Sequence, residues 1–117
     1  MTFLHQIVLC SLVNWKPEEI PIVFGEKVTL FCNTSEVDGV DRLKTTWMQN
    51  TDVVVHRGVS LRPSKFAEQE ESDGSSLIII NTNTEDLMAN YTCLADIYRF
   101  EAKLELNESN YIGKMVT

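Results

Sequence analysis

The feature that most constrains this chain is a pair of cysteines, each placed in a segment where apolar and polar residues alternate. Cys32 closes the run 28–32, whose period of two puts every second residue on one face of a half-buried strand. Cys93 follows Tyr91 at the same period, and Trp47 lies in a third alternating segment between them. Two cysteines and a large aromatic residue can therefore converge inside a core made of two sheets.

The order of Cys32, Trp47 and the Tyr91-x-Cys93 pair resembles that of an immunoglobulin-superfamily domain, over roughly residues 20–106. The resemblance implies an all-β fold, an immunoglobulin-like two-sheet Greek-key sandwich, with Cys32 bridged to Cys93 and Trp47 packed on the bridge. The spacing of the cysteines leaves room for an extra strand, which favours a variable or intermediate type of domain over the shorter constant type. The core residues expected on this basis are Trp47, Tyr91, Leu30 and Leu104.

Length and charge limit the class of protein further. A chain of 117 residues makes one domain with a core of ordinary size. Its formal net charge of -7 argues against nucleic acid or an anionic membrane as the main partner. No Cys-x-x-Cys pair, calcium-loop spacing, nucleophile elbow or phosphate-binding glycine turn is present, so neither an enzyme nor a cofactor is expected. We interpret the acidic segment 68–74 as a solvated hairpin tip.

Cysteine use and sequons indicate the compartment. A disulfide requires oxidising conditions, and it leaves Cys10 as a third cysteine without an assigned role. Asn33, Asn90 and Asn107 each begin an Asn-x-Ser/Thr sequon and are expected to accept N-linked glycans. Both observations predict an extracellular protein, either secreted or at the cell surface.

The chain divides into three parts by composition. Residues 1–15 form either a signal peptide or the first strand, because an apolar run is present but neither a preceding Lys or Arg nor a clean cleavage site accompanies it. Residues 16–107 form the immunoglobulin-like domain, with 15–19 as its polar entry. Residues 108–117 form a C-terminal tail or linker. No transmembrane stretch follows residue 106, so membrane attachment is expected only through a segment absent from this chain.

Between the cysteines, apolar segments separated by turn residues predict several strands. Trp47 is expected to face inward and Met48 outward. Either register of the strand at 77–80 leaves two apolar residues on the outside of its sheet. The expected strands lie at about 28–32, 44–50, 53–56, 59–61, from 65, 77–80 and 100–106.

The sequence leaves one expected ion pair undecided, that of an aspartate in the turn before Cys93. Counting forward from Leu77, the aspartate that such domains place in the turn before the second cysteine falls on Asp86. Counting back from Cys93, the same place is held by Leu87. One residue has been added in this turn, so the sequence does not decide whether Asp86 reaches its expected partner, Arg62 or Lys65.

The resemblance implies a function in recognition, because variable-type relatives bind through an outward sheet face or through loops. Met48 and Leu94 are expected on that face. Ile97, Tyr98 and Arg99 are expected at an exposed hairpin tip, where tyrosine and arginine are typical binding residues. The expected partner is another cell-surface or secreted protein, which includes an immunoglobulin-like protein or a second copy of this chain. A structural spacer in a longer extracellular protein is the alternative.

Overall fold

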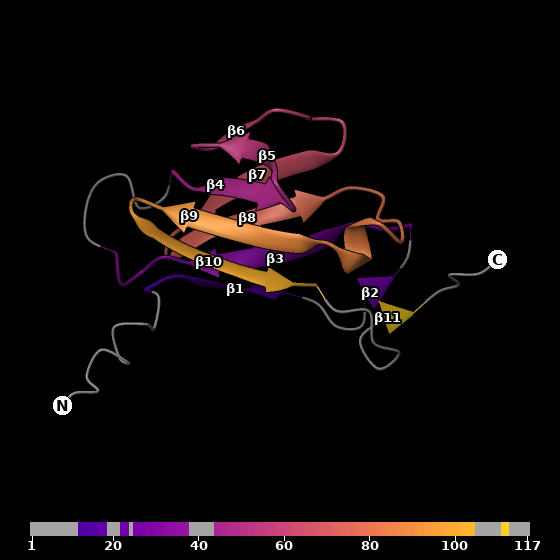
Figure 1. Ribbon diagram of the computed structural model, residues 1–117, viewed down its shortest axis with the longest axis horizontal. Helices are drawn as coiled ribbons and strands as arrows, with labels where there is room; N and C mark the ends of the chain where they lie inside the picture. The colour runs from indigo at the N-terminus through magenta and orange to yellow at the C-terminus, as the bar shows by residue number, and fades with distance from the viewer. Residues whose placement is uncertain (1–11, 19–21, 24, 38–43, 105–110, 113–117) are drawn as a thin grey trace.

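Alternating residues build two antiparallel sheets that pack face to face (Figure 1). The computed structural model describes residues 12–18, 22–23, 25–37, 44–104 and 111–112. The four-stranded sheet has the order β1 (Asn14–Pro17), β3 (Val28–Asn33), β8 (Gly74–Ile79) and β7 (Phe66–Glu71). The five-stranded sheet has the order β10 (Tyr98–Lys103), β9 (Asn90–Ala95), β4 (Thr46–Gln49), β5 (Asp52–His56) and β6 (Val59–Ser60).

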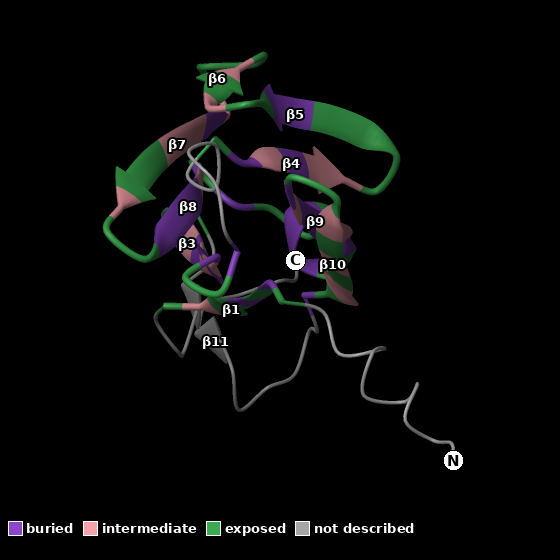
Figure 2. Cartoon of the chain, turned by 90° about the vertical axis from the view of Figure 1, so that its left-hand side faces the viewer, coloured by how far each residue is buried: buried purple, intermediate pink, exposed green. Residues whose placement is uncertain are grey.

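The burial pattern of β3 follows directly from the alternation of apolar and polar residues in its sequence. Val28, Leu30 and Cys32 are buried, and the residues between them are partly exposed. Side chains of this inner set and of the facing strands form one hydrophobic core. Figure 2 colours the buried positions of both sheets purple. Trp47, Tyr91, Leu30 and Leu104 all lie in this core. The chain is therefore an all-β sandwich, as the sequence predicts.

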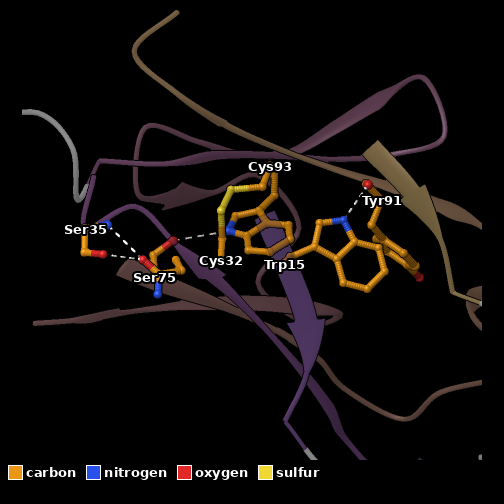
Figure 3. The surroundings of a disulfide bond; sticks show 8 residues. Trp15, Cys32, Ser35, Ser75, Tyr91 and Cys93 are labelled. Carbon is orange, nitrogen blue, oxygen red and sulfur yellow. Dashed lines mark hydrogen bonds between the residues drawn. A yellow bond between two sulfur atoms is a disulfide. The ribbon is translucent and has the colours of Figure 1, made fainter. Parts of the chain in front are cut away.

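A disulfide joins the two sheets at their centre. Cys32 on β3 is bonded to Cys93 on β9, with 6.5 Å between the Cα atoms, which confirms the predicted bridge. The buried Trp47 lies on β4 opposite Cys93, and its Nε1 donates a hydrogen bond of 3.4 Å to Ser75 Oγ (Figure 3). Closing a loop of 61 residues stabilises the folded state by about 4 kcal/mol on the chain-entropy estimate.

The turn before β9 shows how the added residue is accommodated. Residues Asp86–Met88 form a short 3-10 helix, η1, which buries both Asp86 and Leu87. Leu87 joins the core, and Asp86 Oδ2 lies 2.6 Å from Lys65 Nζ. The Tyr91 hydroxyl donates a hydrogen bond of 2.8 Å to the Asp86 carbonyl oxygen. The ion pair that the sequence left open is therefore formed, and Lys65 is the partner.

The N-terminal segment differs from the prediction. Trp15, expected in a polar entry, is buried on β1 opposite Cys32, because it spans the gap between the sheets. Its Nε1 donates a hydrogen bond of 2.8 Å to the Tyr91 carbonyl oxygen (Figure 3). Its ring also meets the Tyr91 and Phe100 rings edge-on. Val13 is buried as well. A polar entry was the wrong interpretation of this segment, because a single large aromatic residue is enough to anchor a four-residue strand.

Two other segments differ in detail. Glu68–Glu71 belong to β7, so the acidic segment is mostly strand, and the turn is confined to residues 72–73. Within the expected C-terminal tail, β11 (Tyr111–Ile112) pairs in parallel with β2 (Ile22–Val23). Cys10, the sequon at Asn107 and the two interpretations of residues 1–11 lie outside the described residues.

Candidate recognition face

The outward side of β9, β4 and β5, which we call the β9–β4–β5 face, carries the apolar residues that the core does not use. On β9 and β4 the inward positions are taken by Tyr91, Cys93 and Trp47. Leu94 is paired with Thr46 and Met48 with Thr92, and all four side chains lie on the opposite side of the sheet. Leu94 and Met48 are each partly exposed there. These two positions agree with the sequence-based placement.

A β-bulge shapes the middle of this face. The register between β4 and β5 shifts at Trp47 and Met48, so that Val54 is an extra residue between Val53 and Val55. Both Val54 and Val55 are buried, whereas Val53 is 40% exposed next to Met48. A bulge lets two consecutive side chains point to the same side of a sheet. Strict alternation could not predict this pattern from three consecutive valines.

The face is hollowed by a shallow groove with a volume of about 370 Å³. Met48, Val53 and Leu94 supply its aliphatic residues. Charged and polar side chains surround them, which is the arrangement of a protein interface with an apolar centre and a polar rim. The remaining lining residues are Lys44, Thr46, His56, Arg57 and Asp96.

The hairpin between β9 and β10 is tighter than expected, with Asp96 and Ile97 as its turn. Asp96 adopts a φ of 58°, which a two-residue hairpin of this kind requires and aspartate tolerates. Ile97 is 80% exposed, the largest exposure among the large apolar residues that the structure describes. Apolar exposure of this degree at a hairpin tip is available to a partner.

Tyr98 does not lie where the sequence placed it. It is the first residue of β10 and is partly buried against the core, on the inner side of the sheet with Phe100 and Ala102. Arg99 points outward, with its Nη2 3.4 Å from Glu101 Oε1. The tight turn moves the hairpin tip toward the N-terminus, so Tyr98 falls on an inward position. Tyr98 is therefore not at the tip, whereas Ile97, which was expected there as well, is.

Sequence reasoning missed a continuation of the face onto β6. Ser60 faces the other sheet, where its Oγ donates a hydrogen bond of 2.6 Å to the Phe66 carbonyl oxygen. Its neighbours Val59 and Leu61 consequently point outward, and they are 63% and 53% exposed. The alternation of Val59, Ser60 and Leu61 could have indicated that the two apolar residues share a side. A segment of three residues is too short, however, to show which side is buried.

Two competing sites are less suited to a partner. On the outer side of the four-stranded sheet, Ile78 is partly exposed, as Met48 and Leu94 are, but its neighbours on β3 and β7 are Thr29 and Ala67 rather than large apolar residues. A polar hollow of about 550 Å³ near η1 contains Arg62, Lys65 and Asp86. Its buried carboxylate is already paired, because Asp86 accepts hydrogen bonds from Lys65, from Gln49 Nε2 at 3.0 Å and from the Asn83 amide at 3.0 Å.

Two sequons lie in the described part of the chain. Asn33 ends β3, and its Oδ1 accepts hydrogen bonds from the Ser35 amide at 2.9 Å and the Ser35 hydroxyl at 2.7 Å. Asn90 begins β9 with the same outward direction as Leu94. A glycan on Asn90 would thus project from the end of the β9–β4–β5 face opposite the hairpin tip.

Other kinds of site were sought in the same residues. Within the described ranges, no group of three His, Cys, Asp or Glu side chains is placed to hold a metal ion. None of the helices described there is long and apolar enough to cross a bilayer. No family model matches the chain, and no curated protein is significantly similar to it. What the structure defines is an immunoglobulin-like sandwich with an inter-sheet disulfide and a buried tryptophan, and the disulfide indicates an oxidising compartment.

Proposed function

We propose that this domain is an extracellular protein-recognition module, a variable-type immunoglobulin domain of a cell-surface receptor or adhesion protein. It binds a protein partner through the β9–β4–β5 face together with Ile97 at the hairpin tip. The observation that carries the proposal is the aliphatic groove of Met48, Val53 and Leu94, bordered by charged side chains. Such a centre loses water on contact, while the rim sets orientation and association rate.

Strand order supports the variable type. The sheet order β10, β9, β4, β5 and β6 corresponds to strands G, F, C, C′ and C″, and β1, β3, β8 and β7 correspond to A, B, E and D. The constant type lacks the strands equivalent to β5 and β6. These two strands supply Val53 and Val59, which together with Leu61, the residue after β6, enlarge the apolar part of the proposed interface.

The partner class follows from charge and compartment. An acidic chain with a formal charge of -7 is a poor ligand for a phosphate backbone. The disulfide and the sequons favour a partner that is itself secreted or at the cell surface, a second copy of this chain included.

The proposal is tested by screening the displayed domain against extracellular proteins, itself included, and then measuring Kd for variants. We expect Leu94→Ala and Ile97→Ala each to weaken binding by about thirtyfold, the loss of 2 kcal/mol that is typical of a central contact. Glu101→Ala, at the rim, should change mainly the association rate and its salt dependence.

Ile78→Ser on β8 is the matched control, because it removes an apolar side chain from the outer side of the other sheet. It should leave Kd unchanged, with folding verified by circular dichroism. Loss of binding only in Ile78→Ser would place the interface on the four-stranded sheet. Absence of any partner for the folded domain would instead favour the spacer alternative.

A further inference from the structure

Two carboxylates occupy inward positions of β7, at the edge where the two sheets meet: Glu68 is partly buried, and Glu70 is exposed. Phe66 on β7 is fully buried, and Glu68 and Glu70 follow it at a period of two, so they point toward the five-stranded sheet. Opposite them on β8, Leu77 and Ser75 are buried as well. β7 and β6 are the edge strands of their sheets and lie side by side in Figure 2.

The turn between β5 and β6 lies directly over these carboxylates. A methyl group placed on Gly58 would lie 3.8 Å from Glu70 Oε2 and 3.9 Å from Glu68 Oε1. The turn is held to the segment before β4, since the Gly58 amide donates a hydrogen bond of 3.1 Å to the Thr45 carbonyl oxygen. Any change in charge at Glu68 therefore acts on a turn that packs against it.

Glu68 is poorly satisfied as an anion. Its Oε2 is buried and has no hydrogen-bond partner. Burial, and next the negative charge of Glu70, raise the pKa of Glu68 from an ordinary 4.5 to about 7, while a hydrogen bond with Ser75 and the ammonium of Lys44 act in the opposite direction. Lys44 lies closer to Glu70, with 3.9 Å between Nζ and Oε2.

We propose that the packing of the β5–β6 turn on β7 is a proton-dependent closure controlled by Glu68. With the carboxyl protonated, the turn stays packed over β7. When Glu68 gives its proton to water, the uncompensated anion beside Glu70 favours opening of the turn, which hydrates the carboxylate. The inference rests on the fold alone and is independent of the proposed function.

The sign of the effect follows from linkage. The closed form binds the proton up to a pKa of about 7, whereas an opened, hydrated glutamate releases it near 4.5. Closure is therefore fully favoured below pH 4.5, weakens as the pH rises from 4.5 to 7, and stays weak above 7.

The effects of other charged groups around the turn must be distinguished from the effect of Glu68. Glu70 shares the inner side of β7, and Lys44 precedes β4. His56 ends β5 and Arg57 begins the β5–β6 turn, and both line the groove on the β9–β4–β5 face. Because His56 directly adjoins the turn, its contribution is tested with its own variant.

Amide hydrogen exchange, corrected for intrinsic rates, tests the closure at pH 5.5 and pH 8. For the Arg57 and Gly58 amides we expect protection to be higher at the lower pH by up to about thirtyfold, the factor that a pKa of about 7 in the closed form and 4.5 in the open form gives between these two pH values. Glu68→Gln should remove this dependence. Glu71→Gln, an outward carboxylate on the same strand, and His56→Gln should retain it. A dependence that survives in Glu68→Gln, vanishes in His56→Gln or is absent in the wild type overturns the proposal.

Nuclear magnetic resonance of the wild type gives a second test that needs no variant. Trp47 Nε1 donates to Ser75 Oγ, which also contacts Glu68, so the Trp47 indole resonance should shift with the Glu68 titration. The Trp15 indole donates to the Tyr91 carbonyl oxygen and serves as the internal reference. A Glu68 carboxyl resonance that titrates near 4.5 contradicts the closure.

Discussion

At the scale of single residues, Gly74 is the position with the least tolerance. It begins β8 opposite Asn33, and a Cβ atom there would lie 1.9 Å from the Cys32 carbonyl oxygen and 3.0 Å from the Phe31 ring. A backbone oxygen cannot move aside as a flexible side chain can. β3 and β8 would have to separate next to the disulfide.

We therefore expect Gly74→Ala to lower the free energy of unfolding by about 3 kcal/mol or more. Asp73→Ala, at the neighbouring exposed turn position, should change it by less than about 0.5 kcal/mol. Urea denaturation of both variants measures the difference. Equal stabilities would mean that β3 and β8 are not held as closely as the structure places them.

Lys65 and Asp86 form the second residue-scale test. The Asp86 side chain is 5% exposed and that of Lys65 21%, so the ion pair is largely removed from water. Breaking such a pair leaves one charge buried without compensation, which costs about 3 kcal/mol. Asp86→Asn and Lys65→Met should each destabilise the fold.

The double variant Asp86→Asn/Lys65→Met separates the pair from the individual losses. We expect it to be less destabilised than the sum of the single variants by about 1 to 3 kcal/mol, because both charges are then absent. Denaturation curves of the four proteins measure this coupling. Additive losses would show that Gln49 and Asn83 alone satisfy Asp86.

At the scale of elements, β1 depends on one side chain. Trp15 joins β1 to the opposite sheet through its hydrogen bond to Tyr91 and its contacts with Tyr91 and Phe100. Trp15→Ala should cost about 3 to 5 kcal/mol of stability, because it removes a large buried aromatic residue. Lys16→Ala, the next residue on the exposed side, should be nearly neutral.

Truncation gives an independent measurement of the same element. Of two truncated chains, the one that starts at Glu18 should melt several degrees lower than the one that starts at Leu12, since it lacks both Val13 and Trp15. The same melting temperature for both chains would show that β1 does not contribute to the core.

At the scale of the whole molecule, glycans and the proposed interface share one sheet. Asn90 lies at the opposite end of β9 from Ala95 and the hairpin tip, a separation of about 16 Å at 3.3 Å per residue. A glycan there would leave Ile97 and Leu94 accessible.

When the chain is secreted from animal cells, we expect Asn33, Asn90 and Asn107 to carry glycans. Enzymatic deglycosylation should increase gel mobility, and each Asn→Gln variant should remove one step. Asn→Gln is the suitable change at the second sequon, because Thr92 is buried and its replacement would disturb the fold. An unchanged mobility would leave the extracellular assignment to the disulfide alone.

The sequence by itself determined the architecture. Alternation around Cys32, Trp47 and Cys93 specified the inward residues, because a period of two assigns every side chain to a face once one is known to be buried. The resemblance of their order to an immunoglobulin-type domain predicted the two sheets and the bridge. Met48 and Leu94 followed from the alternation as well. The recognition face was predictable to that extent.

Tertiary structure decided the features at which the alternation of inward and outward residues is interrupted. The bulge turned Val54 inward, and the two-residue turn placed Tyr98 on the inner side of its sheet. The 3-10 helix η1 absorbed an added residue while Asp86 still reached Lys65. Trp15 also became part of the core, because β1 pairs with β3 at Cys32 and brings the Trp15 ring against Tyr91 and Phe100 of the other sheet. Inserting one residue hardly changes the pattern of the sequence, but it reverses the side of the sheet that each following residue faces. Only the packing of the two sheets therefore fixes where the extra residue is accommodated.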